Sequence, residues 1–358
     1  MKRVLLSCIC LFLVACSGHQ PANHSTTFSN PNQFSPLPYP VSNHAVAQTQ
    51  FQGEAQFFVF NGLTKNKTHA DVTNKAWVWR DKQWQALTVP KNQPAVLASV
   101  AAAVNNQVYL FGGYTVAADG SEKSSPLVWQ IDGDTLNWQA MPEMPTPVDD
   151  SVALVYQDRY IYLVSGWHDV DNVDLVQVFD TQNQTWQQAN AFPLPPVFGQ
   201  AGAIVGNQML VCDGVKVVYD ENKKKQFLPS AECALGAIND HDVTQIEWQS
   251  TPHYSGTAHY RMAAASSDHF AVFVGGSDNP YNYNGIGYDG LPSQASADIR
   301  IYDFNTRTWQ ILAKQLSPNM DHRGLLKTQD EFIVLGGMKA EQELSPQIIN
   351  FNIKALVK

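Results

Sequence analysis

Two arginines and a group of aromatic, amide and imidazole side chains are the residues of this chain best suited to ligand recognition. The paired N–H donors of Arg261 and Arg323 fit a carboxylate, whereas aromatic faces and planar amides fit sugar rings. The candidate ligand-binding residues are Trp167, His168, Tyr260, Arg261, Asp278, Tyr281, Asn282, Tyr283, His322 and Arg323. Together they predict a site for a sugar, an anionic sugar in particular, or for a protein ligand.

Other chemistries have weaker support in the sequence. Asp149 and Asp150 could act as acid and base, but adjacent strand residues point to opposite faces, so at most one would meet a ligand; the alternative is a pair of solvated turn carboxylates. The ten histidines are scattered without metal-ligand spacing, and the chain has no nucleophile elbow, P-loop or dinucleotide fingerprint. We therefore expect no metal and no cofactor, and the catalytic residues stay unknown.

The candidate residues sit within a sequence that repeats. Six apolar runs each end in a glycine turn, and the five intervals from Gly62 to Gly337 cover 275 residues, a mean period of 55. The runs begin at Phe57, Val108, Tyr160, Met209, Phe270 and Phe332. A fixed period of this size is typical of a repeat architecture.

Each repeat has the composition of a four-stranded β unit. A run of small residues such as Ala101-Ala102-Ala103 precedes the apolar run and would fit a strand crowded around a central axis. A Trp follows the apolar run in five repeats, and we expect it to pack between neighbouring units: Trp84, Trp138, Trp186, Trp248 and Trp309. Period-two alternation and turn spacing predict an all-β protein.

These repeats resemble those of a kelch β-propeller. The resemblance implies an all-β, six-bladed propeller with four antiparallel strands per blade, and boundaries near residues 38, 94, 147, 197, 257 and 320. The segment from Tyr260 to Gly290 is similar to that of bacterial kelch proteins labelled galactose-oxidase-like. Kelch repeats also commonly carry an arginine at the start of a blade for hydrogen bonds between blades, which is the alternative role for Arg261 and Arg323. The loop Asn279–Asn284 has an alternative too, as a self-packed turn segment.

The first residues have the features of a targeting signal. Lys2-Arg3 precedes an apolar segment that ends Leu13-Val14-Ala15-Cys16, which resembles the bacterial lipoprotein box. We expect a signal peptide over residues 1–15, a lipidated Cys16 with a flexible tether over residues 16–37, and a propeller over residues 38–358. The resemblance implies a lipid anchor in the outer membrane, facing the periplasm. An ordinary secretory signal is the alternative.

Cysteine positions and the sixth repeat give two further predictions. In the oxidising periplasm, Cys212 and Cys233 are candidates for a disulfide, against two buried free thiols. The sixth repeat lacks its outer strand, which residues 26–34 could supply to close the ring; the alternative is a disordered tether. A copper-radical oxidase needs a further free cysteine to crosslink to tyrosine, so that activity is not expected.

Strand parity predicts where a ligand would bind. In each blade the start of the first strand and the end of the second share one rim, so blade-start residues such as Asn43, Asp150 and Asp321 should meet the loops after the glycine turns. We expect a monomeric binding propeller without enzymatic activity. The alternative is a mutarotase or epimerase, because six-bladed kelch propellers include the periplasmic sialic acid mutarotases. A net charge of −9 without basic clusters argues against nucleic acid.

Overall fold

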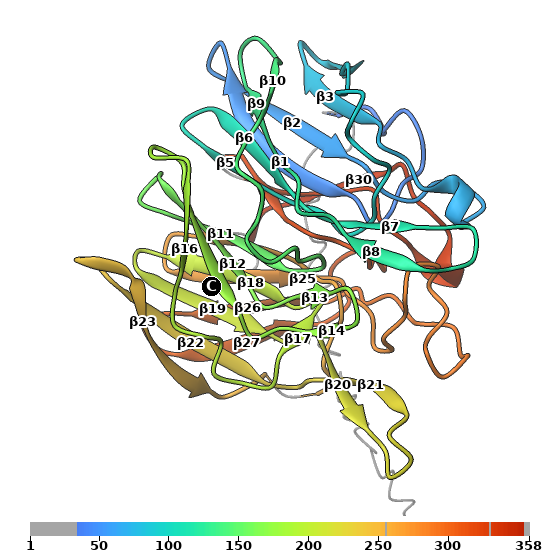
Figure 1. The fold of residues 1–358 in the computed structure, drawn as a ribbon, viewed down its shortest axis with the longest axis vertical. Coiled ribbons are helices and arrows are strands. Elements are labelled where there is room, and N and C mark those ends of the chain that lie inside the picture. The colour runs from blue at the N-terminus through green and yellow to red at the C-terminus, as the bar shows by residue number, and fades with distance from the viewer. Residues whose placement is uncertain (1–33, 255, 329–330, 354–358) are drawn as a thin grey trace, which may run out of the picture.

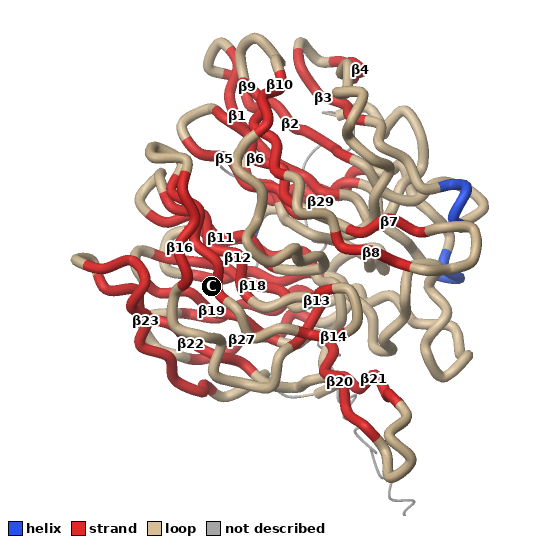
Figure 2. Tube along the Cα trace, in the orientation of Figure 1, coloured by secondary structure: helices blue, strands red, loops and turns tan. Residues whose placement is uncertain are grey.

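The computed structural model describes residues 34–254, 256–328 and 331–353, and these form an almost entirely β structure. Helix is limited to two short 3-10 turns, η1 (His69–Asp71) and η2 (Ala340–Gln342) (Figure 2). No helix in the described ranges is long and apolar enough to span a membrane. The signal segment, Cys16 and most of the predicted closing strand at residues 26–34 lie outside the described residues.

Strands group into sheets that follow the sequence repeats in order (Figure 1). The four-stranded sheets are β1 (Ala45–Phe51), β2 (Glu54–Phe60), β3 (Ala76–Arg80), β4 (Gln83–Ala86); β5 (Val100–Val104), β6 (Gln107–Phe111), β9 (Val128–Asp132), β10 (Trp138–Ala140); β11 (Val152–Tyr156), β12 (Tyr160–Val164), β15 (Val176–Asp180), β16 (Thr185–Gln188); β18 (Ala201–Val205), β19 (Gln208–Cys212), β22 (Cys233–Asn239), β23 (Asp242–Thr251); and β24 (Ala263–Ser267), β25 (Phe270–Val274), β26 (Ile299–Asp303), β27 (Thr308–Leu312). A three-stranded sheet of β28 (Leu326–Lys327), β29 (Phe332–Leu335) and β30 (Ile348–Phe351) follows.

The first strands of these sheets stand side by side around a central axis. β1 packs beside β5, β5 beside β11, β11 beside β18, and β18 beside β24. β28 contacts β1, and the amide N–H of Leu325 donates to the carbonyl of Ala264 in β24 at 3.3 Å, which completes the circle. The small side chains of these strands allow this approach. The fold is therefore an all-β propeller, as the sequence predicts.

Each sheet packs against the next through large apolar side chains. The ring of Trp138 in β10 meets Phe60 of the preceding sheet edge-on at 5.7 Å, and Trp186 in β16 meets Phe111 at 5.9 Å. These contacts agree with the predicted place of the repeat tryptophans between units. Burying such rings supplies much of the apolar stabilisation, at about 25 cal/mol per Å² removed from water.

Hairpins inserted after the second strands lie at one end of the propeller, which we call the loop face. They are β7 (Tyr114–Val116) with β8 (Glu122–Ser124), β13 (Trp167–His168) with β14 (Asp171–Asn172), and β20 (Val215–Tyr219) with β21 (Lys225–Pro229). The short strand β17 (Val197–Phe198) pairs with β20. Figure 1 shows the β20–β21 hairpin extending away from the body. The 277–296 segment between β25 and β26, which we call the cap loop, has no long strand of its own.

Candidate functional site

Six residues, each shortly before the first strand of a sheet, form a ring at the loop face, which we call the mouth ring. They are Asn43, Ala98, Asp150, Gly199, Arg261 and Asp321, and all six have positive φ, between 47° and 71°. Amide N–H groups of Ala98, Asp150, Gly199 and Arg261 each donate to the carbonyl of the ring residue before them, at 2.8–3.0 Å. Asn43 and Asp321 complete the ring through the Asn43 N–H and the Asp321 carboxylate, at 3.1 Å.

The left-handed backbone of the mouth ring explains several of its residue types. Asn, Asp and Gly adopt positive φ most readily, whereas an arginine there is uncommon and costs about 1–2 kcal/mol. At Gly199 a side chain is also excluded by space, because a Cβ would lie 1.9 Å from the ring of Tyr260. The strained backbone at Arg261 is therefore held by the contacts of its side chain.

Four charged side chains fill the centre of the ring, and we call them the mouth cluster: Asp150, Arg261, Asp321 and Arg323. Arg261 forms a bidentate ion pair with Asp150 and also lies 3.4 Å from Asp321. Arg323 contacts Asp150 at 2.7 Å and Asp321 at 2.8 Å. All four side chains are at most 2% exposed, so two positive and two negative charges neutralise one another out of water.

The arginines favour the ionised form of Asp321. Burial opposes ionisation of Asp321, but Arg323 and Arg261 outweigh it, so the pKa of Asp321 is held below its ordinary value. Both arginines are committed to aspartates within the protein. This geometry favours the alternative role of Arg261 and Arg323, in which they link neighbouring blades. A pair of arginines that binds a ligand's carboxylate would instead face solvent.

Aromatic rings predicted for the site support the mouth cluster. The guanidinium of Arg261 lies 4.4 Å from the ring centre of Tyr260 and 5.1 Å from that of Tyr281, and both tyrosines are buried. Arg261 also donates to the carbonyl of Asn282 at 2.7 Å, and the Asn43 amide donates to the carbonyl of Tyr283 at 3.2 Å. Tyr260, Arg261, Tyr281, Asn282, Tyr283 and Arg323 are thus brought together at one rim.

The side chains of the other predicted site residues make no hydrogen bond or ion pair with the charged groups of this cluster among the interactions of the described residues. His322 is buried beside it and pairs with the Asn319 side chain at 3.0 Å; burial and His44 lower the pKa of His322 to about 3. Trp167 packs against Phe198 at 5.4 Å, and His168 donates to the Pro147 carbonyl. Asp278 accepts the Gln294 N–H at 2.9 Å and faces a separate surface pocket.

The cap loop crosses from blade five to the loops of other blades. The Asn282 amide accepts from the Tyr114 hydroxyl at 3.1 Å and donates to the Glu122 carboxylate at 2.7 Å, both in the β7–β8 hairpin. Tyr288 stacks on Phe227 of the β20–β21 hairpin with ring centres 3.9 Å apart. The cap loop therefore spans the propeller mouth, so its asparagines and glycines serve more than a self-packed turn.

Burial raises the pKa of two carboxyl groups near the loop face. Burial raises the pKa of Asp149 well above its ordinary value, and the nearby Asp150 and Glu122 add to the shift. Burial also raises the pKa of Glu122. Asp149 accepts a hydrogen bond from the Ser124 hydroxyl at 2.6 Å. The sequence analysis missed Glu122 because it lies in an inserted hairpin, outside the repeat pattern.

Exposed apolar side chains gather on the same face as these loops. We define the loop-face patch as Val170 (72% exposed), Leu291 (62%), Tyr219 (55%), Leu228 (41%), Tyr288 (40%) and Ile286 (39%). Contacts join the three segments that carry it: Lys225 donates to the Val170 carbonyl, Tyr219 donates to Asp171, and Tyr288 stacks on Phe227. In the described residues only Ile311, on the outer strand β27, is a comparably exposed large apolar residue elsewhere.

Comparisons with known proteins agree with this architecture. Residues 43–229, just over half of the chain, match the model of the KLHDC2/KLHL20/DRC7 Kelch-repeats domain. The chain belongs to this kelch-repeat family. It is 24% identical over 302 residues to mouse and human Kelch-like protein 15, covering 83% of this chain and 47% of theirs. It is 23% identical to mouse Kelch domain-containing protein 1, covering 69% and 62% respectively. The chain thus spans about half the length of the first of these relatives.

A solved structure has the same fold as this kelch chain. The structure titled "Structure of YjhT" superposes with a TM-score of 0.69 at 15% identity, covering 88% of this chain and 95% of that chain. Identity at this level shows the shared propeller fold alone. The function must therefore be argued from the residues of this chain.

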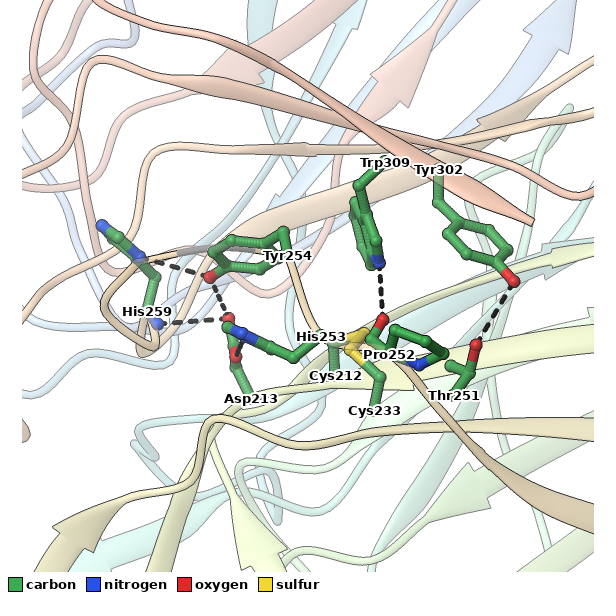
Figure 3. Close-up of a disulfide and its surroundings, with 10 residues drawn as sticks. All are labelled: Cys212, Asp213, Cys233, Thr251, Pro252, His253, Tyr254, His259, Tyr302 and Trp309. Carbon is green, nitrogen blue, oxygen red and sulfur yellow. Dashed lines mark hydrogen bonds and ion pairs between the residues drawn. A yellow bond between two sulfur atoms is a disulfide. The ribbon is translucent and has the colours of Figure 1, made fainter. Parts of the chain in front are cut away.

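A second polar network of the kelch domain surrounds its disulfide (Figure 3). Cys212 and Cys233, directly paired across β19 and β22, are bonded through sulfur. The next residue, Asp213, accepts hydrogen bonds from His253 at 2.5 Å, from the Tyr254 hydroxyl and from the His259 backbone at 3.1 Å.

This network is internally satisfied. The Tyr254 hydroxyl donates to Asp213, so the His259 Nδ1–H donates to Tyr254, and His259 Nε2 is left to accept from Arg300 at 2.9 Å. Burial and Arg300 lower the pKa of His259 to about 4, in agreement with this neutral tautomer. Among the described residues, no three His, Cys, Asp or Glu side chains are grouped to hold a metal ion. The network holds His253, Tyr254 and His259 against Asp213, which directly follows β19.

Proposed function

We propose that this protein is a non-catalytic binding propeller that recognises a protein partner through the loop-face patch. The observation that carries the proposal is the concentration of exposed apolar side chains on three contacting segments of one face. Soluble proteins rarely leave such side chains in a group unless something covers them. The mouth cluster, by contrast, has its charges neutralised and leaves little for a ligand to neutralise.

The chemistry of the patch favours a protein over a glycan or a bilayer. Val170, Leu228, Ile286 and Leu291 offer no hydrogen bonds, which a sugar surface needs. The tip of the β20–β21 hairpin carries exposed Glu221, Lys223 and Lys224, so inserting it into lipid would desolvate charges. Apolar and tyrosine side chains beside a charged rim are typical of protein interfaces.

Photo-crosslinking tests this proposal against a matched control. A benzophenone amino acid at position 291 should capture one defined protein in intact cells, whereas the same group at position 311, an exposed apolar site on β27, should not. Leu228→Asp in the 291-labelled protein should abolish the capture. Equal capture at both positions, or capture insensitive to Leu228→Asp, would refute a specific protein interface.

The location of the protein is part of the same proposal. The Leu13-Val14-Ala15-Cys16 box supports lipidation of Cys16 and anchoring in the outer membrane on the periplasmic side. Mass spectrometry of the mature N-terminus should find an acylated Cys16. An unmodified N-terminal residue other than Cys16 would remove the anchor from the proposal, while leaving the patch to be tested separately.

A sugar mutarotase or epimerase is a second candidate, favoured by the raised pKa values of Asp149 and Glu122. One carboxyl in its protonated form could donate its proton to a sugar's ring oxygen, while the other in its ionised form accepts the proton of the anomeric hydroxyl. NMR of anomer exchange on a panel of sugars, sialic acid included, should show acceleration that Asp149→Asn abolishes. No acceleration on any sugar would exclude this candidate.

A further inference from the structure

The hairpin that extends from the loop face ends its sheet in an edge strand. The sheet has the strand order β17, β20, β21, so β21 has a neighbour on one side only among the described strands (Figure 1). β21 pairs antiparallel with β20 and places Phe227 opposite Val217. The other side of an edge strand presents backbone groups that can pair with another chain.

The register shows which backbone groups of β21 point away from β20. The N–H of Asp220 donates to the carbonyl of Lys224 at 3.0 Å, at the turn of the hairpin. Bonded and non-bonded pairs alternate along an antiparallel ladder, so the backbone groups of Lys225, Phe227 and Pro229 face outward. None of these groups has a hydrogen-bond partner among the residues that the structure describes.

The spacing of the outward groups matches the backbone of one more strand. Lys225 and Phe227 each offer an N–H and a carbonyl, and Pro229 offers a carbonyl. Donors and acceptors at every second residue are the pattern that an adjacent strand satisfies. A helix uses its own backbone groups internally and cannot satisfy such a row. The segment that fits this edge is therefore extended.

Apolar side chains of the loop-face patch lie on both faces beside this edge. Adjacent residues of a strand point to opposite faces, so Phe227 and Leu228 face opposite ways. Tyr288, which is 40% exposed, stacks on Phe227, and Leu228 is 41% exposed. Alternate side chains of an added strand would contact Tyr288 on one face and Leu228 on the other. Such a strand would cover both of these exposed residues.

The hairpin tip sets the charge of the segment that fits beside it. Residues 220–225 hold three lysines against two acids, in a chain whose net charge is −9. Lys223 and Lys224 are exposed, while Lys225 donates to the carbonyl of Val170. A carboxylate on the added strand near the tip would be attracted by these lysines.

A second copy of this chain fits the edge poorly. Lysines on an edge strand discourage pairing between identical edges. In an antiparallel pair of two β21 strands centred on Phe227, Pro229 of one copy would lie opposite Lys225 of the other. Proline has no N–H, so the carbonyl of Lys225 would stay without a donor. A different protein is therefore the favoured occupant.

We propose that the partner of the loop-face patch binds by strand addition, through an extended acidic segment that pairs with the outer edge of β21. This inference rests on the protein interface proposed above and adds the shape and charge of the segment that is recognised. The backbone of Lys225 and Phe227 supplies affinity, whereas Leu228 and Tyr288 select the side chains of the segment.

Peptide titrations on the purified full chain test strand addition. The probe is the fluorescein-labelled peptide Glu-Glu-Val-Tyr-Val-Thr-Glu-Glu, and fluorescence anisotropy should show that it binds saturably. The same peptide with N-methyl groups on its Val-Tyr-Val residues loses the backbone donors and should bind at least tenfold more weakly. Replacing its four glutamates by lysines should also weaken binding, because the tip would then repel it.

A matched pair of protein variants isolates the backbone of β21. Lys225→Pro removes an outward N–H without removing a bond to β20, whereas Lys225→Ala loses the same side chain and keeps the N–H. The peptide should bind about tenfold more weakly to the proline variant than to the alanine variant. Hydrogen exchange of the wild-type chain covers the case in which Lys225→Pro fails to fold. The amides of residues 225 and 227 should exchange more slowly when the peptide is bound.

The outcomes separate strand addition from the interface on which it rests. Strand addition is overturned by equal binding of the methylated peptide, by equal affinity of the two variants, or by no saturable binding of any peptide. A wild-type dimer that Lys225→Pro dissociates would assign the edge to a second copy and overturn it too. Capture from position 291 that survives Lys225→Pro leaves the protein interface standing without strand addition. No capture from that position refutes the interface itself.

Discussion

The mouth cluster and the loop-face patch lie at the same end of the propeller, and the cap loop contributes to both. At the mouth, Arg261 and Arg323 are buried and each contacts two aspartates. On the patch, Val170 and Leu291 are mostly exposed. Buried charges that are fully paired hold a structure together, whereas exposed apolar groups await a partner. The difference is that the charges of Arg261 and Arg323 are paired within the protein, whereas the apolar side chains of the patch are left uncovered.

The strongest test of this comparison is the removal of one charge from the mouth cluster. Arg261→Met should lower the free energy of unfolding by about 3–5 kcal/mol, because Asp150 is left buried with part of its pairing lost. Urea unfolding followed by circular dichroism measures the change. The matched control is Lys339→Met: its ion pair with Glu343 is 47% exposed on the lysine side and 66% on the glutamate side, and its loss should cost less than about 1 kcal/mol.

The disulfide should give the next largest effect. Replacing Cys212 and Cys233 together by serine should cost about 3 kcal/mol, since the bond closes a loop with a sequence separation of 21. Thermal unfolding with and without dithiothreitol measures it. The double variant should be insensitive to the reductant, and an unchanged wild-type midpoint in reductant would show that the bond does not stabilise the protein.

How far the sequence predicts this molecule depends on the range of the interactions. Alternation and turn residues act locally, so the strands and the shared rim of Arg261 and Arg323 could be predicted from them. The pairing of Arg261 with Asp150 joins residues 111 positions apart and depends on how blades meet around the ring. The patch was not predicted, because an exposed Leu291 and a buried Leu316 look alike in a sequence.

Buried histidines at the closure of the ring predict a smaller, pH-dependent effect. Burial lowers the pKa of His44 to about 4 and that of His322 to about 3, although Asp321 opposes both shifts. The unfolded chain binds these protons near pH 6.5, so stability is full above that pH and is lost as the pH falls toward 4.

The expected slope is about 1.4 kcal/mol per pH unit for each histidine. His44→Gln removes one of these groups. It should therefore reduce the slope of the unfolding free energy against pH, between pH 6 and pH 4.5, by about 1.4 kcal/mol per pH unit. Urea unfolding at several pH values measures this slope. An identical slope in wild type and variant would mean that His44 is not neutral in the folded protein.

The smallest effect on stability is expected within the patch itself. Leu291 is 62% exposed in the cap loop, so Leu291→Ser should change the free energy of unfolding by less than about 0.5 kcal/mol. Tyr281, in the same loop, is fully buried against Tyr260 and Arg261, so Tyr281→Ala should cost about 3 kcal/mol or more. A large loss of stability in Leu291→Ser would make the patch part of the fold, and the contrast with the mouth cluster would fail. A neutral Leu291→Ser leaves a partner as the reason for an apolar side chain at that position.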